Sequence, residues 1–70
     1  MTLNEWIVFV GGVDRAADVL RLRPRTVASW YRFERVPEIA MAANIVLRTN
    51  GRVDYNGIYA PIAANRKGSS

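Results

Sequence analysis

The chain has 70 residues, of which half are apolar, and it carries a formal net charge of +4 without any cysteine or histidine. This length allows one small domain with a single core. The absence of cysteine excludes disulfides and thiolate zinc sites, and the absence of histidine removes the commonest general base and transition-metal ligand. The longest apolar runs have five residues, as in residues 6–10, and are far shorter than the roughly 20 residues of a membrane span, so we expect no membrane partner.

The positive charge is concentrated in residues 21–35. This segment contains five arginines and one acid, whereas residues 1–20 carry a net charge of −2 and residues 36–70 a net charge of +2. Such a segment is a candidate surface for phosphate, an anionic lipid or an acidic partner. Nine of the ten basic residues are arginines, whose planar guanidinium suits bidentate recognition of phosphate or guanine.

The first predicted element is a helix that begins near Leu3. Thr2 and Glu5 have the spacing of a capping box, in which each side chain bonds the backbone N–H of the other residue. Gly11 and Gly12 end this helix. Its buried stripe is predicted to contain Leu3, Trp6, Ile7 and Val10. The β-branched residues of this run would also suit a strand, but the capping box favours a helix.

Two further short helices are predicted, joined by a tight turn. Apolar residues recur at helical spacing from Val13 to Leu20, and Asp14 lies in the first turn, where the helix dipole favours a carboxylate. Pro24 suits the first turn of a third helix, expected over residues 24–33. We expect the buried side of this helix to contain Val27, Trp30 and Tyr31, and its exposed side to contain Arg25, Ala28, Ser29 and Arg32. Stacking of the Trp30 and Tyr31 rings on bases is the alternative, but their shared stripe with Val27 favours core packing.

The second half of the chain predicts one apolar helix and a final turn. Pro37 opens the helix, and Asn50 with Gly51 ends it. Its apolar stripe is predicted to be Ile39, Ala42, Ala43, Ile45 and Val46. Asp54 suits the cap of one last turn before Pro61, and residues 62–70 are expected to form a disordered tail.

These elements predict an all-α domain of four to five short helices over residues 1–61. The predicted core consists of Trp6, Val10, Ala17, Leu20, Val27, Trp30, Ile39 and Val46.

Residues 13–32 fit the twenty-residue pattern of a helix-turn-helix, with the small Ala17 at the crossing and Val27 and Trp30 anchoring the second helix. The segment GGVDRAADVLRLRPRTVASWYR, followed by RVP, an apolar helix and TNGRV, resembles the Cro-type regulators of temperate phages over roughly residues 4–60. It is also similar to the Apl-type phage proteins, which repress transcription and assist prophage excision. The resemblance implies a lambda repressor-like fold, a place in the cytoplasm of a bacterial host, and double-stranded DNA as the partner.

Arg21 departs from the family pattern, which has glycine at this point of the turn because the backbone tends to need a positive φ. A residue other than glycine there costs roughly 1 kcal/mol. Arg21 therefore indicates either a tolerated strain or a turn that differs in detail, and its side chain could point at a phosphate.

The resemblance places the helix that begins at Pro24 in the major groove of DNA. It implies base contacts from Arg23, Arg25, Ala28, Ser29 and Arg32. It implies phosphate contacts from Arg15, Arg21, Thr26, Arg35 and Arg52. Arg25 and Arg32 are the candidates for bidentate contacts to guanine, and Ala28 is small enough to contact a thymine methyl. Because the family binds as dimers on two half-sites, and some excision factors coat repeated sites, we expect self-association.

Three functions remain open for such a domain. The first is a sequence-specific transcriptional regulator, here a phage repressor. The second is a recombination directionality factor, or excisionase, that coats or bends DNA at an attachment site. The third is an anti-repressor that binds a protein. An enzyme is not expected, because Ser29 is the only serine before the last two residues and no histidine or cysteine is present. We expect no cofactor, metal or small-molecule substrate.

Val8 and Phe9 have two interpretations. They either wrap a small core or form an exposed apolar patch, which in a small DNA-binding domain would suggest self-association. A competing place for such a contact is the segment with Tyr55, Ile58 and Tyr59.

Overall fold

The computed structural model describes the backbone of residues 1–69 and the side chains of residues 1–65. Within this range the chain forms helices and no strands, as the sequence predicts. The helices are α1 (Leu3–Phe9), α2 (Val13–Leu20), α3 (Pro24–Tyr31), α4 (Ile39–Arg48) and α5 (Tyr55–Ser69).

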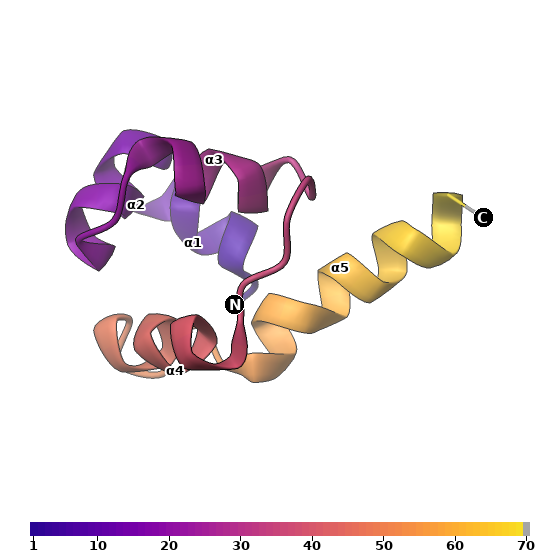
Figure 1. The fold of residues 1–70 in the computed structure, drawn as a ribbon. Helices are drawn as coiled ribbons and strands as arrows, with labels where there is room; N and C mark the ends of the chain where they lie inside the picture. The colour runs from indigo at the N-terminus through magenta and orange to yellow at the C-terminus, as the bar shows by residue number, and fades with distance from the viewer. Residues whose placement is uncertain (70) are drawn as a thin grey trace.

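The helices are arranged in two layers (Figure 1). The first three helices lie together in one layer, and α4 with the first turns of α5 forms the other. Helix α2 joins the layers because it contacts α1, α3 and α4. The later turns of α5 extend away from both layers. None of the helices within residues 1–69 has the length and apolar character needed to cross a membrane.

The predicted cap of α1 is confirmed. The Thr2 hydroxyl accepts from the N–H of Glu5 at 3.1 Å, and a carboxylate oxygen of Glu5 accepts from the N–H of Thr2 at 2.8 Å. The hydrogen bond from the Thr2 backbone lowers the pKa of Glu5 below its ordinary value. Asp54 caps α5 in the predicted way, since its side chain accepts from the N–H of Gly57 at 2.7 Å.

The helices α1 to α4 end in a common manner, in which a backbone N–H donates to a carbonyl five residues earlier. These bonds are Gly12 to Ile7 at 2.8 Å, and Leu22 to Ala17, Glu34 to Ser29 and Gly51 to Val46 at 2.9 Å each. This pattern needs a residue with positive φ just before the donor. The position is filled by Gly11 in α1 and by Arg21, Phe33 and Asn50 in the other three.

Arg21 therefore adopts the left-handed conformation, with φ 56° and ψ 45°. Of the two alternatives that the sequence allows, the tolerated strain is the one observed.

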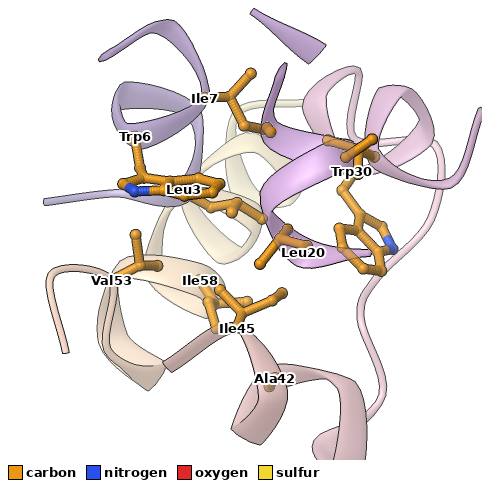
Figure 2. Close-up of a cluster of buried hydrophobic side chains, with 12 residues drawn as sticks. Leu3, Trp6, Ile7, Leu20, Trp30, Ala42, Ile45, Val53 and Ile58 are labelled. Atoms are coloured by element: carbon orange, nitrogen blue, oxygen red, sulfur yellow. The ribbon is translucent and has the colours of Figure 1, made fainter. Parts of the chain in front are cut away.

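The core lies between the two layers. Its members, all less than 9% exposed, are Leu3, Trp6, Ile7, Ala16, Ala17, Leu20, Val27, Trp30, Ala42, Ile45, Val53 and Ile58. Figure 2 shows Trp6 on the side of Val53 and Trp30 on the opposite side, with Leu20 between them. Leu20, the last residue of α2, lies above Ile45 and Ile58 in this view, at the boundary between the layers.

Several predicted core positions are wrong. Val10 and Val46 are only partly buried, and Tyr31 and Ile39 are exposed, by 38% and 71%. The buried stripe of α4 begins at Ala42, one turn after Ile39, and α4 is covered along one side only. Ala43 is therefore exposed as well.

Helix α4 begins at Ile39 and not at the predicted Pro37. The carbonyl of Pro37 accepts a hydrogen bond from the Tyr59 hydroxyl at 2.8 Å, so it is turned toward α5. Glu38 remains extended, with ψ 161°. The helix thus starts two residues later than predicted, next to this tertiary contact.

The predicted end of the last helix at Pro61 is also wrong, because α5 continues through this proline to Ser69. The continuation places Ile62 one turn after Ile58, and Ile62 is buried with 8% exposure. The expected disordered tail is therefore helical over residues 62–69, and Ser70 lies outside the described residues.

Thr49 is a buried polar side chain, 4% exposed, at the end of α4. Its hydroxyl donates to the carbonyl of Ile45 at 2.8 Å and accepts from the N–H of Val53 at 3.2 Å. One hydroxyl thus holds the segment between α4 and α5 against the end of α4.

We expect Arg21→Gly to raise the free energy of unfolding by about 1 kcal/mol, because glycine adopts positive φ without the steric cost that arginine carries. Urea denaturation measures the change. Arg23→Gly is the matched control, because it also removes an arginine but at a position with an ordinary φ of −75°, where glycine relieves no strain. An equal gain from both substitutions would contradict the backbone explanation.

Thr49→Val should lower the free energy of unfolding by about 1–3 kcal/mol, because the N–H of Val53 would lose its acceptor inside the protein. Thr49→Ser, which keeps the hydroxyl, should lose less. Denaturation of the two variants side by side provides the measurement. A Thr49→Val protein as stable as the parent would show that the hydroxyl is dispensable.

Candidate nucleic-acid interface

Helix α3 separates its apolar and basic side chains onto opposite sides. Val27 and Trp30 are buried, with 0% and 5% exposure, and face the core. Arg23, Arg25 and Arg32 are exposed, and we call these three the basic face. With about 100° of rotation per residue, Arg25 and Arg32 lie roughly opposite the buried pair.

The position of α3 is set by its contact with α2. The contact between α2 and α3 is more extensive than that between any other two of the described helices. On α2, Ala16 and Ala17 are buried, with 0% and 1% exposure. Small side chains on the buried side of α2 leave room for neighbouring helices to pack closely. Arg21, Leu22 and Arg23 form the connection, and Pro24 is the first residue of α3 as predicted.

Ala28 and Ser29, two of the expected base-contact residues, are half-buried. The Ser29 hydroxyl donates to the carbonyl of Thr26 at 2.6 Å within α3. Its proton is therefore already engaged, while its oxygen still has acceptor capacity. Thr26 is also half-buried, so its side chain is less accessible than that of Arg25 beside it.

A hollow of about 420 Å³ separates α3 from the start of α4, and we call it the α3–α4 hollow. Arg25 and Arg35 both line it, although the sequence predicts a base contact for Arg25 and a phosphate contact for Arg35. Thr26 and Ser29 line it from α3, and Glu38 lines it from the segment before α4.

A second hollow of about 500 Å³ lies between the start of α2 and the exposed side of α3, and we call it the α2–α3 hollow. It brings together Arg25, Ala28 and Arg32, three of the expected base-contact residues. Arg25 lines both hollows and so occupies the centre of the exposed side of α3.

The α2–α3 hollow also contains Asp14, which the sequence does not assign to the site, and Tyr31, for which the sequence favours the core over a contact with bases. Tyr31 was expected in the core because it follows Val27 by four residues. Around the helix axis, however, Tyr31 lies between Val27 and Ala28, whereas Trp30 lies on the other side of Val27. The i, i+3 spacing from Ala28 to Tyr31 is the signal that could have placed it on the exposed side.

Three arginines expected to contact phosphate lie apart from these hollows. Arg15 is exposed on α2, and Arg21 is exposed in the turn. Arg52 lies between α4 and α5 with its guanidinium carbon 5.3 Å from the centre of the Phe9 ring, a cation–π contact with α1. The structure thus brings Arg52 to α1, and its phosphate contact stays a prediction.

Val8 and Phe9 are exposed, by 63% and 60%. Of the two interpretations that the sequence allows, the exposed apolar pair is the one observed.

Two hydrogen bonds fix the ends of the segment after α3. The side-chain amide of Asn4 donates to the carbonyl of Tyr31 at 3.1 Å, which holds the end of α3 against α1. The Tyr59 hydroxyl donates to the carbonyl of Pro37 at 2.8 Å, which holds the start of α4 against α5. Arg35 lies between these two anchors.

Among the described residues, no three acidic side chains approach one another closely enough to hold a metal ion.

Comparison of the chain with family models, with curated proteins and with solved structures finds no match.

Tyr59→Phe should cost about 1 kcal/mol of stability, because it removes one hydrogen bond while keeping the ring. Amide hydrogen exchange should also become faster over residues 33–38 than elsewhere. Tyr55→Phe is the matched control, since Tyr55 is 47% exposed. Uniform exchange in both variants would show that the Tyr59 contact does not restrain this segment.

Proposed function

We propose that the protein is a sequence-specific regulator that binds double-stranded DNA, and that α2, the turn at Arg21 and α3 form a helix-turn-helix. In this proposal α3 enters the major groove, which is wide enough to admit an α-helix. The type of regulator that we propose is a Cro-type repressor.

One observation carries the proposal. Arg25 and Arg32 of the basic face are exposed on the side opposite Val27 and Trp30, so the helix can present guanidinium groups while its other side stays anchored in the core. A helix anchored in this way can enter a groove without unfolding part of the core.

The proposed contacts fall into two groups. Arg25 and Arg32 would read guanine through paired hydrogen bonds, with Arg23, Ala28 and Ser29 beside them. Phosphate contacts would position the helix without reading sequence, and their candidates are Arg15, Arg21, Thr26, Arg35 and Arg52. Thr26 and Arg35 are the best supported of these, because both line the same hollow as Arg25, and Arg35 is the more exposed of the two.

Contacts between copies on DNA would use Val8 and Phe9. These two large apolar side chains are adjacent and exposed, and they lie on α1, outside the basic face. Their burial against a second copy would leave the basic face free for DNA.

Selection of binding sites from random duplex DNA, at two salt concentrations, tests the proposal. An enriched motif whose affinity falls steeply with salt is expected. Two half-sites would support a dimer, while closely spaced repeats with induced bending would favour the excisionase. Failure to enrich any motif, with binding lost at physiological salt, would overturn the proposal.

Substitutions on the selected site separate the two kinds of contact. Arg25→Ala should weaken binding to the selected site by about 1–3 kcal/mol and relax the base preference at one position of the site. Arg15→Ala should weaken binding to all sequences alike and flatten the salt dependence by about one unit of slope. Fluorescence anisotropy on matched and altered duplexes provides the measurement.

Arg48→Ala is the control for charge alone, because Arg48 is exposed in the last turn of α4 and belongs to neither predicted group. It should leave the base preference unchanged. Identical behaviour of the Arg25 and Arg15 variants would contradict the placement of α3 in the groove.

A further inference from the structure

Tyr31 is the one large aromatic side chain of α3 that does not enter the core. It is 38% exposed, whereas Trp30 beside it is 5% exposed. Its backbone carbonyl accepts from the side chain of Asn4 at 3.1 Å, so the last turn of α3 is held in place while the Tyr31 ring remains outside. An anchored backbone with an accessible ring suits a contact residue.

The ring of Tyr31 belongs to the apolar part of the α2–α3 hollow. Ala28 lies one turn earlier on the same side of α3, and Pro24 lies one turn before that. Val13 lines the hollow from α2. These apolar groups beside Tyr31 favour a small apolar ligand group over a fully hydrated one.

The polar groups of the hollow indicate a base edge and not a phosphate. Arg25 and Arg32 supply hydrogen-bond donors, and Asp14 supplies a carboxylate in the same hollow. A phosphate offers only acceptor oxygens and carries a negative charge, which the carboxylate of Asp14 would repel. A base edge in the major groove offers donors, acceptors and, in thymine, an apolar C5-methyl group.

We propose that Tyr31 is a specificity-determining residue whose ring packs against the C5-methyl group of a thymine in the bound duplex. This inference rests on the proposed function, because it needs α3 in the major groove. It adds to the base-reading set a residue that the sequence assigns to the core.

Replacement of each thymine of the selected site by deoxyuridine, one at a time, tests the inference, because deoxyuridine lacks only the C5-methyl group. The parent protein should lose about fourfold in affinity at one position, the value expected for one buried methyl group. Tyr31→Ala should bind the thymine and deoxyuridine duplexes equally at that position. Tyr31→Phe, which keeps the ring, should retain the parent's preference.

Tyr55→Ala is the matched control, since Tyr55 is an exposed tyrosine of α5 outside the hollow, and it should keep the parent's preference. Circular dichroism melting of each variant checks the fold. A different outcome would overturn the inference: Tyr31→Ala binds all sequences equally more weakly and still loses about fourfold on the deoxyuridine duplex. That result would mean that Tyr31 contacts the DNA backbone and not the thymine methyl group.

The outcomes separate the two proposals. If the parent protein selects a motif but no deoxyuridine substitution changes its affinity, the role of Tyr31 is wrong while DNA binding stands. If no motif is selected at all, both proposals fail.

Discussion

The close crossing of α2 and α3 is the contact on which the rest of the structure depends. The buried side of α2 carries two small side chains, Ala16 and Ala17, and the chain reverses sharply at Arg21, where the backbone is left-handed. A larger side chain at Ala17 would separate the helices, and a different backbone at Arg21 would redirect α3. Because α2 also contacts α1 and α4, the same crossing orients α3 relative to both layers.

The crossing explains how a small core can support a strongly basic surface. Val27 and Trp30 secure one side of α3, so the arginines on the other side are held apart by the helix itself and remain in solvent, where their mutual repulsion is weak. The two hollows beside α3 then give this surface a shape, since Arg25 lies between them. Charge and shape thus arise from one packing arrangement.

The sequence predicts features that depend on nearby residues. The capping box of α1, the double glycine after it and Pro24 at the start of α3 are local signals, and the structure confirms them. The boundaries of α4 and α5 coincide with contacts to distant residues, which local patterns do not contain: the Tyr59 hydroxyl bonds Pro37 before α4, and Ile62 of α5 is buried. At the candidate site, the exposed arginines of α3 follow from the helical pattern, whereas the side on which Tyr31 lies and the position of Arg52 over Phe9 depend on tertiary packing.

The left-handed residues at the ends of α2, α3 and α4 have a consequence for the lifetime of the protein in a cell. Arg21, Phe33 and Asn50 all have positive φ without being glycine, and each kcal/mol of strain raises the unfolded population about fivefold. Cellular proteases degrade unfolded molecules, so modest differences in stability change protein abundance. A domain of 70 residues has little stability in reserve. The steady-state amount of the protein would therefore depend on the backbone strain at these three positions as well as on the rate of synthesis.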